Sequence, residues 1–259
     1  MSPIMHIERI ITHDGSFHAD EVMAIALIFE HLGERPVSRT RQISDAEFED
    51  PAVWVIDVGR RFDPARACFD HHQDASLAAS CCLLADHLRQ AGLMPPALHE
   101  EMGSMLHVVS DMDRHGNGDY NGIQFSWVIR MLGNLEDGFD RAIDLCRCVI
   151  RAARQTVADQ AASKSIWDAG VDIAPRARTC SDYPVLWKRY ATHHLLIYPD
   201  KDMWYVVTYD SRILPLESTG RERFMHNSRF TAGFDTREDA EACALATIAA
   251  AERPSQRAS

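Results

Sequence analysis

Residues 53–58 read VWVIDV, and this run limits what the chain can fold into more than any other stretch. Almost every position is apolar, which is typical of a strand buried on both faces of a parallel sheet. Parallel strands need crossover connections, which are usually helices. We therefore expect an α/β domain in which strands and helices alternate along the chain.

Further strands and helices are expected around this run. Three segments are rich in β-branched or aromatic residues, as strands are: 7–12, 37–41 and 67–69. Three others show apolar residues at helical spacing: from Asp20 to a stop at Gly33, 76–91 and 98–111. The predicted fold class is α/β, with an N-terminal parallel-sheet domain that has helices on both faces and a smaller C-terminal α+β domain.

The composition changes after residue 169. A long helix over 137–169 is expected to lead out of the first domain. Beyond it, the segments 194–198 and 204–209 flank the turn PDKD, which is a hairpin pattern, and a final helix is predicted over 236–251. We expect a first domain over 1–136, a connecting helix and linker over 137–175, and a second domain over 176–259.

The chain carries 27 Lys and Arg residues against 38 Asp and Glu residues, a net charge of −11 with neutral histidine. Proteins that coat nucleic acid are basic, so this class is disfavoured, whereas an enzyme that holds metal ions with carboxylates is compatible with the charge. The seven cysteines include no CxxC pair, and residues 1–10 lack an export signal. No apolar run approaches the roughly 20 residues that cross a bilayer. We expect a reduced, cytoplasmic protein that does not enter a membrane.

Four clusters of histidine and carboxylate residues follow the predicted elements of the first domain. They are His13-x4-His18-x-Asp20, Asp57, Asp70-His71-His72 and Asp111-Met112-Asp113. In open α/β sheets the loops beyond the carboxyl ends of the strands converge on one crevice. We therefore expect these side chains to face one another.

Mixed imidazole and carboxylate ligands suit Mn²⁺, Fe²⁺, Co²⁺ or Zn²⁺ better than Ca²⁺ or Mg²⁺. Asp57 is a candidate to bridge two ions, because a strand end holds it rigidly. Each residue alone has an ordinary interpretation: His18 as a surface or helix-capping residue, Asp57 as a turn residue, and the adjacent histidines as a solvated patch. Their conjunction at the ends of successive elements favours a metal site.

The order of these motifs resembles the DHH phosphoesterase superfamily, which is named for the tripeptide seen at Asp70-His71-His72. Most members open with a histidine followed by Asp-x-Asp, whereas this sequence has THDGSFHADE, with His18 where the first aspartate usually stands. That variant is similar to one branch, the exonuclease-like Myg (melanocyte proliferating gene) family. The runs VIDVG, FDHH, VLWK (185–188) and RFMHNSRFTAG (223–233) are also similar to that branch. The resemblance covers nearly the whole chain.

The resemblance implies a role for each cluster. One metal would be held by His13, His18 and Asp57, and the other by Asp20, Asp57, His71 and Asp111. His72 would contact the scissile phosphate, and Asp70 would orient a histidine from behind the ligands. Asp113 has no clear counterpart in the superfamily and is expected to support the ligands in the same way. The predicted catalytic residues are therefore Asp57, His71 and His72.

The resemblance also implies a substrate loop in the second domain, with five contact residues: His226, Asn227, Ser228, Arg229 and Gly233. Without the resemblance, a solvated β-turn would be the simpler interpretation of this stretch. Between Asp210 and Phe224 the chain is much shorter than longer Myg-type members, so a platform for long polymers is disfavoured. Four tryptophans, Trp127, Trp167, Trp187 and Trp204, are expected in the core rather than as stacking platforms for bases.

The activity implied is that of a metal-dependent phosphodiesterase, an exonuclease on short oligoribonucleotides that uses a hydroxide activated by two divalent metal ions. Mn²⁺ is the expected metal, with Mg²⁺, Co²⁺, Fe²⁺ or Zn²⁺ as alternatives. The expected partner is a short oligoribonucleotide or nucleotide substrate, and a homodimer is a possible assembly. Three alternatives stay open: a hydrolase of a small phosphoanhydride or cyclic dinucleotide, a non-catalytic metal-bound regulatory module, and metal ligands that only stabilise the fold.

Overall fold

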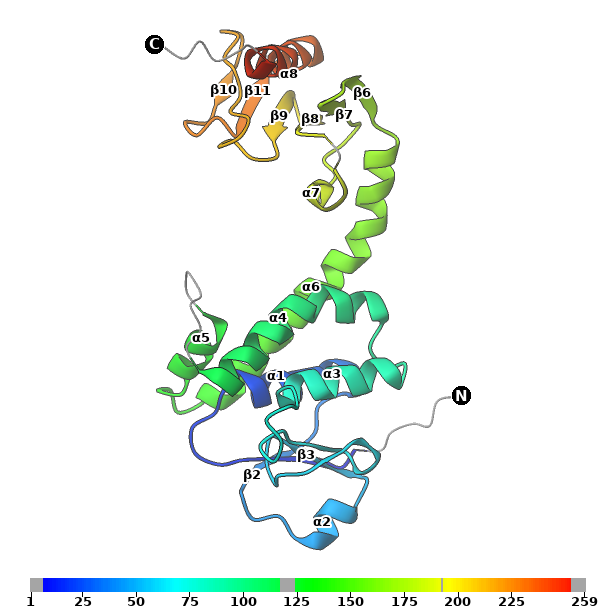
Figure 1. The fold of residues 1–259 in the computed structure, drawn as a ribbon, viewed down its shortest axis with the longest axis vertical. Helices are drawn as coiled ribbons and strands as arrows, with labels where there is room; N and C mark the ends of the chain where they lie inside the picture. The colour runs from blue at the N-terminus through cyan, green and yellow to red at the C-terminus, as the bar shows by residue number, and fades with distance from the viewer. Residues whose placement is uncertain (1–6, 117–123, 192, 253–259) are drawn as a thin grey trace. The chain divides into compact units, whose positions relative to one another are not determined.

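The computed structural model of the chain describes residues 7–116, 124–191 and 193–252 (Figure 1). Its contacts divide the chain into two compact units, Met1–Val157 (unit 1) and Ala158–Ser259 (unit 2). The division falls within the helix α6 (Gly138–Asp168). Strands and helices alternate along unit 1, so the expected α/β class is confirmed. The three-part division expected from the sequence stays a prediction.

Unit 1 contains a five-stranded sheet in the order β2-β1-β3-β5-β4. Its strands are β1 (Arg9–Thr12), β2 (Val37–Arg39), β3 (Val53–Ile56), β4 (Phe62–Asp63) and β5 (Cys68–Phe69). The first three and β5 pair in parallel, and β4 adds an antiparallel edge that the sequence analysis missed. The carboxyl ends of β1, β3 and β5 therefore lie next to one another.

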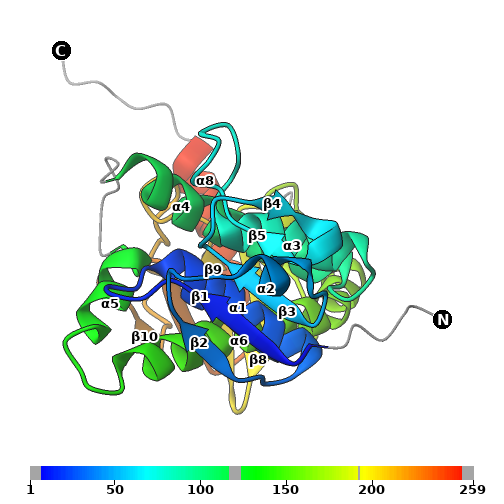
Figure 2. The ribbon, with the colours of Figure 1, turned by 90° about the horizontal axis from the view of Figure 1, so that it is seen from below.

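The two faces of this sheet are covered by helices to very different extents. The helices of unit 1 are α1 (Ala19–Leu32), α2 (Asp45–Glu49), the 3-10 helix η1 (Pro64–Arg66), α3 (Ser80–Gln90), α4 (Pro96–His115), α5 (Phe125–Leu132) and the first part of α6. On one face α1 and α3 pack, with α4 and α5 against α1. The opposite face, seen from below in Figure 2, is covered by the short α2. The sequence analysis did not predict α2 or α5.

The apolar run of β3 is explained by burial on both sides. Trp54 and Ile56 join the large core beneath α1, whereas Val53 and Val55 join a smaller cluster that Phe48 of α2 covers. Adjacent residues of a strand point to opposite faces, so a strand covered on both faces has no polar side.

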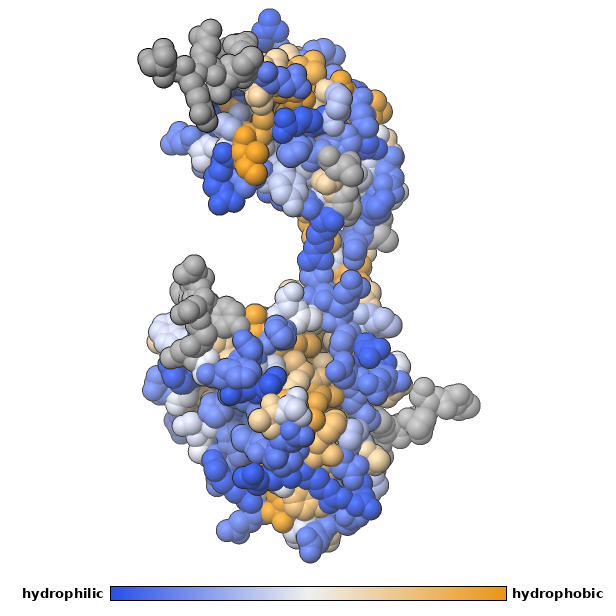
Figure 3. All heavy atoms as spheres, viewed as in Figure 1, coloured by the Kyte–Doolittle hydropathy of each residue, from blue (hydrophilic) through white to orange (hydrophobic). Residues whose placement is uncertain are grey.

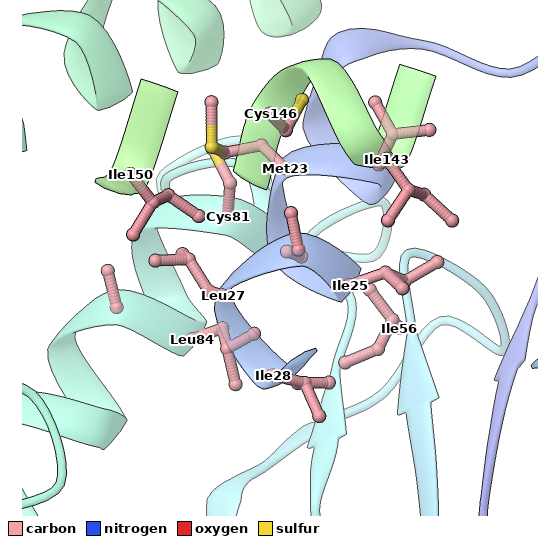
Figure 4. Close-up of a cluster of buried hydrophobic side chains, with 14 of the residues drawn as sticks. Met23, Ile25, Leu27, Ile28, Ile56, Cys81, Leu84, Ile143, Cys146 and Ile150 are labelled. Carbon is pink, nitrogen blue, oxygen red and sulfur yellow. The ribbon is translucent and has the colours of Figure 1, made fainter. Parts of the chain in front are cut away.

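Helix α1 lies at the centre of the core. Ten of its 14 residues are buried, and its side chains meet β3, α3 and α6 in Figure 4. A helix buried almost all round shows little amphipathic pattern, which is why its sequence is nearly uniformly apolar. The helix ends as predicted at Gly33, whose positive φ of 88° suits glycine at a helix C-cap.

Unit 2 contains a six-stranded sheet in the order β10-β11-β9-β8-β7-β6. Its elements are β6 (Val171–Ala174), β7 (Ala177–Thr179), α7 (Trp187–Tyr190), β8 (Leu195–Asp200), β9 (Met203–Thr208), β10 (Phe224–Met225), β11 (Thr231–Phe234) and α8 (Arg237–Glu252). The predicted hairpin is present as the antiparallel pair β8 and β9, and α8 packs on the same sheet.

The surface and the thiols bear on the expected compartment, which stays a prediction. Hydrophilic side chains cover most of the face of each unit that Figure 3 shows. Within the described residues, no helix has both the length and the apolar character needed to cross a membrane. All seven cysteines are free thiols.

Candidate metal centre

The candidate ligands of unit 1 come from the carboxyl ends of three adjacent parallel strands. His13 directly follows β1, Asp57 follows β3, and the Asp70-His71-His72 tripeptide follows β5. The first turn of α1 brings Asp20 to the same place. The expected convergence of these clusters is therefore observed.

Potential ligand atoms gather in three groups, each within 4.8 Å. They are His13, His18, Glu21 and Asp57; then Asp57, His71 and His72; then Asp20, His71 and Asp113. Asp57 and His71 each belong to two groups, so the three groups form one continuous cluster.

The His13 ring is fixed by a backbone contact. Its Nδ1 atom lies 2.9 Å from the carbonyl oxygen of Asp14, and because a carbonyl only accepts, Nδ1 carries a proton and donates it. The other nitrogen, Nε2, lies 3.1 Å from Glu21 Oε1 and 3.6 Å from Asp57 Oδ2. The contact with Glu21 outweighs burial and raises the pKa of His13 to about 9. A ring N–H held by a backbone carbonyl is common in histidines that ligate metals, and here it leaves Nε2 facing the cluster.

His71 is surrounded by carboxylates in the same way. Its Nε2 atom lies 3.1 Å from Asp113 Oδ2, 3.3 Å from Asp57 Oδ1 and 3.8 Å from Asp20 Oδ2. Burial lowers the pKa of His71, but the contacts with Asp113 and Asp57 prevail and raise it to about 10. Despite these short distances, Nε2 has no hydrogen-bond partner of acceptable geometry among the described residues.

Asp57 stands at the centre of the cluster. Its backbone has a positive φ of 57°, which is uncommon for a residue other than glycine and turns the chain sharply at the end of β3. The carboxylate is buried, and its Oδ1 atom accepts a hydrogen bond of 3.0 Å from Ser80 Oγ. Within the described part of the chain, Oδ2 has no hydrogen-bond partner.

The start of helix α3 holds the Asp20 carboxylate. The backbone N–H groups of Ser80 and Cys81 donate to its two oxygens over 2.9 Å and 2.7 Å, as helix N-termini do for carboxylates. Burial nevertheless raises the pKa of Asp20, and the nearby Asp57 and Asp113 raise it further. With Glu21, the cluster holds four carboxylates, the others being those of Asp20, Asp57 and Asp113. Their crowding favours a compensating positive charge.

Glu21 is a member of the cluster that the sequence analysis did not single out. Both of its carboxylate oxygens accept from the backbone N–H of His18 at 2.8 Å, and one of them lies beside His13. Burial raises the pKa of Glu21. Two local patterns could have pointed to Glu21: its three-residue spacing from His18, which is that of a capping box, and its place as the last residue of the motif THDGSFHADE.

The two histidines of the tripeptide lie in different environments. His71 points into the cluster, whereas the His72 side chain is 52% exposed. Asp70 accepts from His72 Nδ1 at 2.7 Å and from the His72 backbone N–H at 3.0 Å. Asp70 therefore orients His72, in agreement with the role expected for it, and leaves Nε2 as the ring nitrogen available to a ligand.

The positions of Asp111 and Asp113 differ from the expectation. Helix α4 continues past Asp111 to His115, and residues two apart on a helix point in different directions. Asp111 has a 40% exposed side chain that contacts His115 at 3.0 Å, and it belongs to none of the three groups. Asp113 approaches His71 and lies 3.8 Å from His18 Nδ1. The geometry therefore puts Asp113 in the position that the resemblance assigned to Asp111.

The predicted substrate loop lies in unit 2, between β10 and β11. His226 Nδ1 lies 2.8 Å from Ser228 Oγ, and the backbone N–H of Arg229 donates to the His226 carbonyl over 2.7 Å. Asn227 lies between them, and these four residues form an exposed turn. Gly233 is buried in β11, where a Cβ atom would lie 2.3 Å from the Met203 side chain, so its observed role is close packing.

The donor set of the cluster fits divalent metal ions. Asp57 Oδ2 and His71 Nε2 are both buried and lack hydrogen-bond partners among the described residues, although each faces further ligand atoms. Buried polar atoms are otherwise almost always paired. Imidazole nitrogens and carboxylate oxygens that converge on common points are the ligands that Mn²⁺, Fe²⁺, Co²⁺ and Zn²⁺ use.

Two cavities of unit 1 adjoin the cluster. One of about 650 Å³ is lined by His13, His18, Asp57 and His72, together with Arg41 and Arg60. The other, of about 240 Å³, is lined by His18, Asp20 and Asp113, together with Trp127 and Arg130. A ligand in either cavity can therefore meet both candidate metal ligands and an arginine.

The part of the chain that holds most of the cluster is similar to a known protein family. Residues 9–81 match the model of the MYG1 exonuclease family, which is described as an uncharacterised protein family (UPF0160). This segment includes every member of the three groups except Asp113.

Curated relatives show the same resemblance. A MYG1 protein of Chlamydia muridarum is 36% identical over 143 residues, which cover 52% of this chain and 48% of the relative. The MYG1 exonucleases of Bos taurus and Homo sapiens are 42% and 40% identical over 74 residues, which cover 28% of this chain and 19% of each relative. The chain thus spans about half the length, or less, of the curated relatives it matches. The resemblance to the Myg family that the motifs predicted is therefore confirmed for the segment that contains most of the candidate metal centre. Its expected extent over nearly the whole chain is greater than the 52% of the chain that the match to the Chlamydia muridarum protein covers.

Proposed function

We propose that this chain is a metal-dependent phosphodiesterase that removes nucleotides from an end of short oligoribonucleotides. The observation that carries the proposal is that Asp57 belongs to two groups of converging ligand atoms and has one buried oxygen without a hydrogen-bond partner among the described residues. A carboxylate shared between two such groups is the arrangement that a two-metal site requires. The exonuclease names of the mammalian relatives support the same reaction class.

The first proposed ligand set is taken from one observed group, and the second combines members of the other two groups. One ion would be held by His13, His18 and Asp57, with Glu21 beside them. The second would be held by Asp20, Asp57, His71 and Asp113, with Asp113 in place of Asp111. We propose Mn²⁺ as the metal, because imidazole and carboxylate ligands are present in similar numbers. When bound, such ions supply a water of lowered pKa and neutralise charge on a phosphate.

The residues of the chain supply binding, orientation and charge. Asp70 holds His72 by two hydrogen bonds, which aims the exposed ring at the larger cavity. Arg60 lines the same cavity, and its guanidinium has no hydrogen bond or ion pair among the described residues. We propose that His72 and Arg60 contact the oxygens of the scissile phosphate, where fixed donors stabilise developing negative charge.

We keep the loop of unit 2 as a proposed second contact surface for the substrate. The hydroxyl of Ser228 and the guanidinium of Arg229 are exposed and chemically suited to a phosphate or a ribose. His226 and Asn227 belong to the same turn. Gly233 contributes close packing of β11 and not a direct contact.

The first test is hydrolysis of an end-labelled short RNA by purified protein in Mn²⁺, together with an Asp57→Asn variant. We expect a ladder of shortened products from the wild type and at least a hundredfold lower rate from the variant, since Asp57 is shared by both groups. An Asp74→Asn variant, in the same loop but outside the three groups, is the matched control and should retain the activity.

Metal content and other substrates distinguish the alternatives. Equilibrium dialysis followed by elemental analysis should give two metal ions per wild-type chain and fewer in Asp57→Asn. Two bound ions without cleavage of RNA, but with cleavage of pyrophosphate or a cyclic dinucleotide, would redirect the proposal to a small phosphate substrate. Two bound ions with no hydrolysis of any of these compounds would favour a regulatory module.

A further inference from the structure

The smaller cavity beside the cluster carries an aromatic residue that the sequence analysis expected in the core. Trp167 and Trp187 are buried, as expected, but Trp127 is 45% exposed. The expectation for Trp127 is therefore wrong. A single exposed tryptophan is not unusual by itself. The position of Trp127 is informative because it lines a cavity together with candidate metal ligands.

The exposure of Trp127 follows from the way α5 packs. Phe125, Ile129 and Leu132 recur at helical spacing and pack against the core of unit 1. Trp127 and Arg130 are three residues apart, so they lie together on the side of the helix away from that stripe. Among the described residues, the Trp127 ring has no aromatic or cationic partner.

Arg130 is similarly available to a ligand. It is exposed, it lines the same cavity, and its guanidinium forms no hydrogen bond or ion pair within the described residues. Other arginines of this acidic chain are paired, for example Arg41 with Asp14 and Arg147 with Glu30. A planar guanidinium without a partner is suited to a phosphate or another oxyanion.

We infer that Trp127 and Arg130 form a nucleotide-binding subsite, in which the indole stacks on a nucleobase and the guanidinium contacts a phosphate adjoining the one that is cleaved. The inference rests on the proposed function, because it takes the substrate to be a nucleotide chain at the metal centre. Base stacking on an aromatic side chain tolerates any base, so the subsite recognises the class of substrate and not its sequence. The same cavity is also lined by Asp20 and Asp113, which puts the subsite beside the proposed second metal.

The proposed subsite would favour a nucleotide substrate over a small inorganic phosphate compound. Inorganic pyrophosphate has no ring to stack on Trp127, whereas a nucleoside monophosphate has both a ring and an anion. The volume of about 240 Å³ is small for a pocket that encloses a whole ligand, and it suits one nucleotide unit of a longer substrate.

The test is a calorimetric titration of the Mn²⁺-loaded protein with AMP and, separately, with ribose 5-phosphate, which lacks the base. We expect Trp127→Leu to weaken AMP binding about tenfold and to leave ribose 5-phosphate unchanged. Trp127→Phe should retain most of the affinity, because a smaller ring still stacks. Arg130→Gln should weaken both compounds. Met131→Ala is the matched control, since Met131 is 49% exposed on the same helix and does not line the cavity.

The outcomes separate the subsite from the reaction. AMP binding that depends on Trp127 in a protein that cleaves no phosphodiester would uphold the subsite and discard the proposed function. RNA cleavage by a wild type whose AMP affinity is unchanged by Trp127→Leu would uphold the function and overturn the subsite. Equal affinities of the wild type for AMP and ribose 5-phosphate, or no binding of AMP, would also overturn it.

Discussion

The Nε2 atom of His71 lies 3.1 Å from the Oδ2 atom of Asp113, without the geometry of a hydrogen bond. His71 follows strand β5, and Asp113 belongs to the last turn of helix α4. The two atoms therefore meet only because the helix ends over the edge of the sheet. This contact selects Asp113, and not Asp111, as the carboxylate from α4 that faces the candidate metal centre.

The first prediction compares these two aspartates. Asp113→Asn should lower metal affinity by roughly 10- to 100-fold or more, the range found for residues that support or form metal sites, and should abolish most activity. Asp111→Asn should leave both near the wild-type level, because the Asp111 side chain is 40% exposed and belongs to none of the three groups of ligand atoms. Metal titration and hydrolysis of the labelled RNA provide the measurements. Loss of metal in Asp111→Asn but not in Asp113→Asn would make Asp111 the ligand, as the family resemblance implies.

The second prediction concerns Ser80, whose hydroxyl donates to Asp57 Oδ1 over 3.0 Å. Ser80→Ala removes this hydrogen bond but keeps the backbone N–H that donates to Asp20. We expect about tenfold weaker metal binding and a similar fall in kcat/KM with the fold intact, because Asp57 loses the group that orients it. Ser76→Ala is the control, since Ser76 is exposed and, among the described residues, its hydroxyl bonds to Asp74 and not to the cluster. An unchanged metal affinity in Ser80→Ala would show that Asp57 is held by other contacts.

The third prediction concerns Gly59, which follows Asp57 by two residues and lines the larger cavity. Its φ is 92°, and a Cβ atom there would lie 2.6 Å from the Phe48 ring of α2. Gly59→Ala should therefore lower the free energy of unfolding by about 2 to 4 kcal/mol, from strain in the backbone and overpacking together. Gly92 also has a positive φ, of 72°, but a Cβ atom there would have no atom within 4 Å. Gly92→Ala should therefore lower the free energy of unfolding by about 1 kcal/mol only. Urea unfolding of both variants measures the difference, and equal costs would mean that α2 yields to the added methyl group.

The fourth prediction is a pH dependence of stability at Glu30 of α1. The Glu30 side chain is 6% exposed and meets Arg147 at 3.0 Å, Arg151 at 2.7 Å and Arg154 at 3.3 Å, all from α6. Burial raises the pKa of Glu30, but Arg151 and Arg147 outweigh it and lower the pKa from 4.5 to about 2. A carboxylate with a lowered folded-state pKa stabilises the fold above its unfolded pKa and loses this effect as the pH falls toward the folded value.

Glu30→Gln should therefore cost about 2 kcal/mol of unfolding free energy at pH 7, and the difference from the wild type should disappear as the pH falls from about 5 toward 2. Glu34→Gln is the control, because Glu34 is 64% exposed and contacts only Arg147 of these arginines. Urea unfolding across this pH range measures the difference. A cost for Glu30→Gln that is independent of pH would show that the charge of Glu30 contributes nothing.

Much of the fold and part of the candidate site could be predicted from the sequence, because both depend on local patterns. The run VWVIDV predicted a buried parallel strand, and the helix stop at Gly33 followed from the conformational freedom of glycine. His13, Asp57 and His71 could be grouped because each lies within two residues of the end of a strand, and the ends of parallel strands meet at one edge. These relationships need only the chain order and the hydrophobic pattern.

Other features depended on the tertiary structure alone. Asp111 and Asp113 are both in α4, and only the rotation of that helix against α1 and α3 decides which of them faces His71. Ser80 contacts Asp57 because α3 packs against α1 and β5, and no local pattern indicates that contact. Trp127 has the composition of a core residue but lies on the far side of a helix whose core stripe is Phe125, Ile129 and Leu132. The period of a hydrophobic pattern defines the faces of an element, whereas packing against its neighbours decides which face becomes core and which becomes the site.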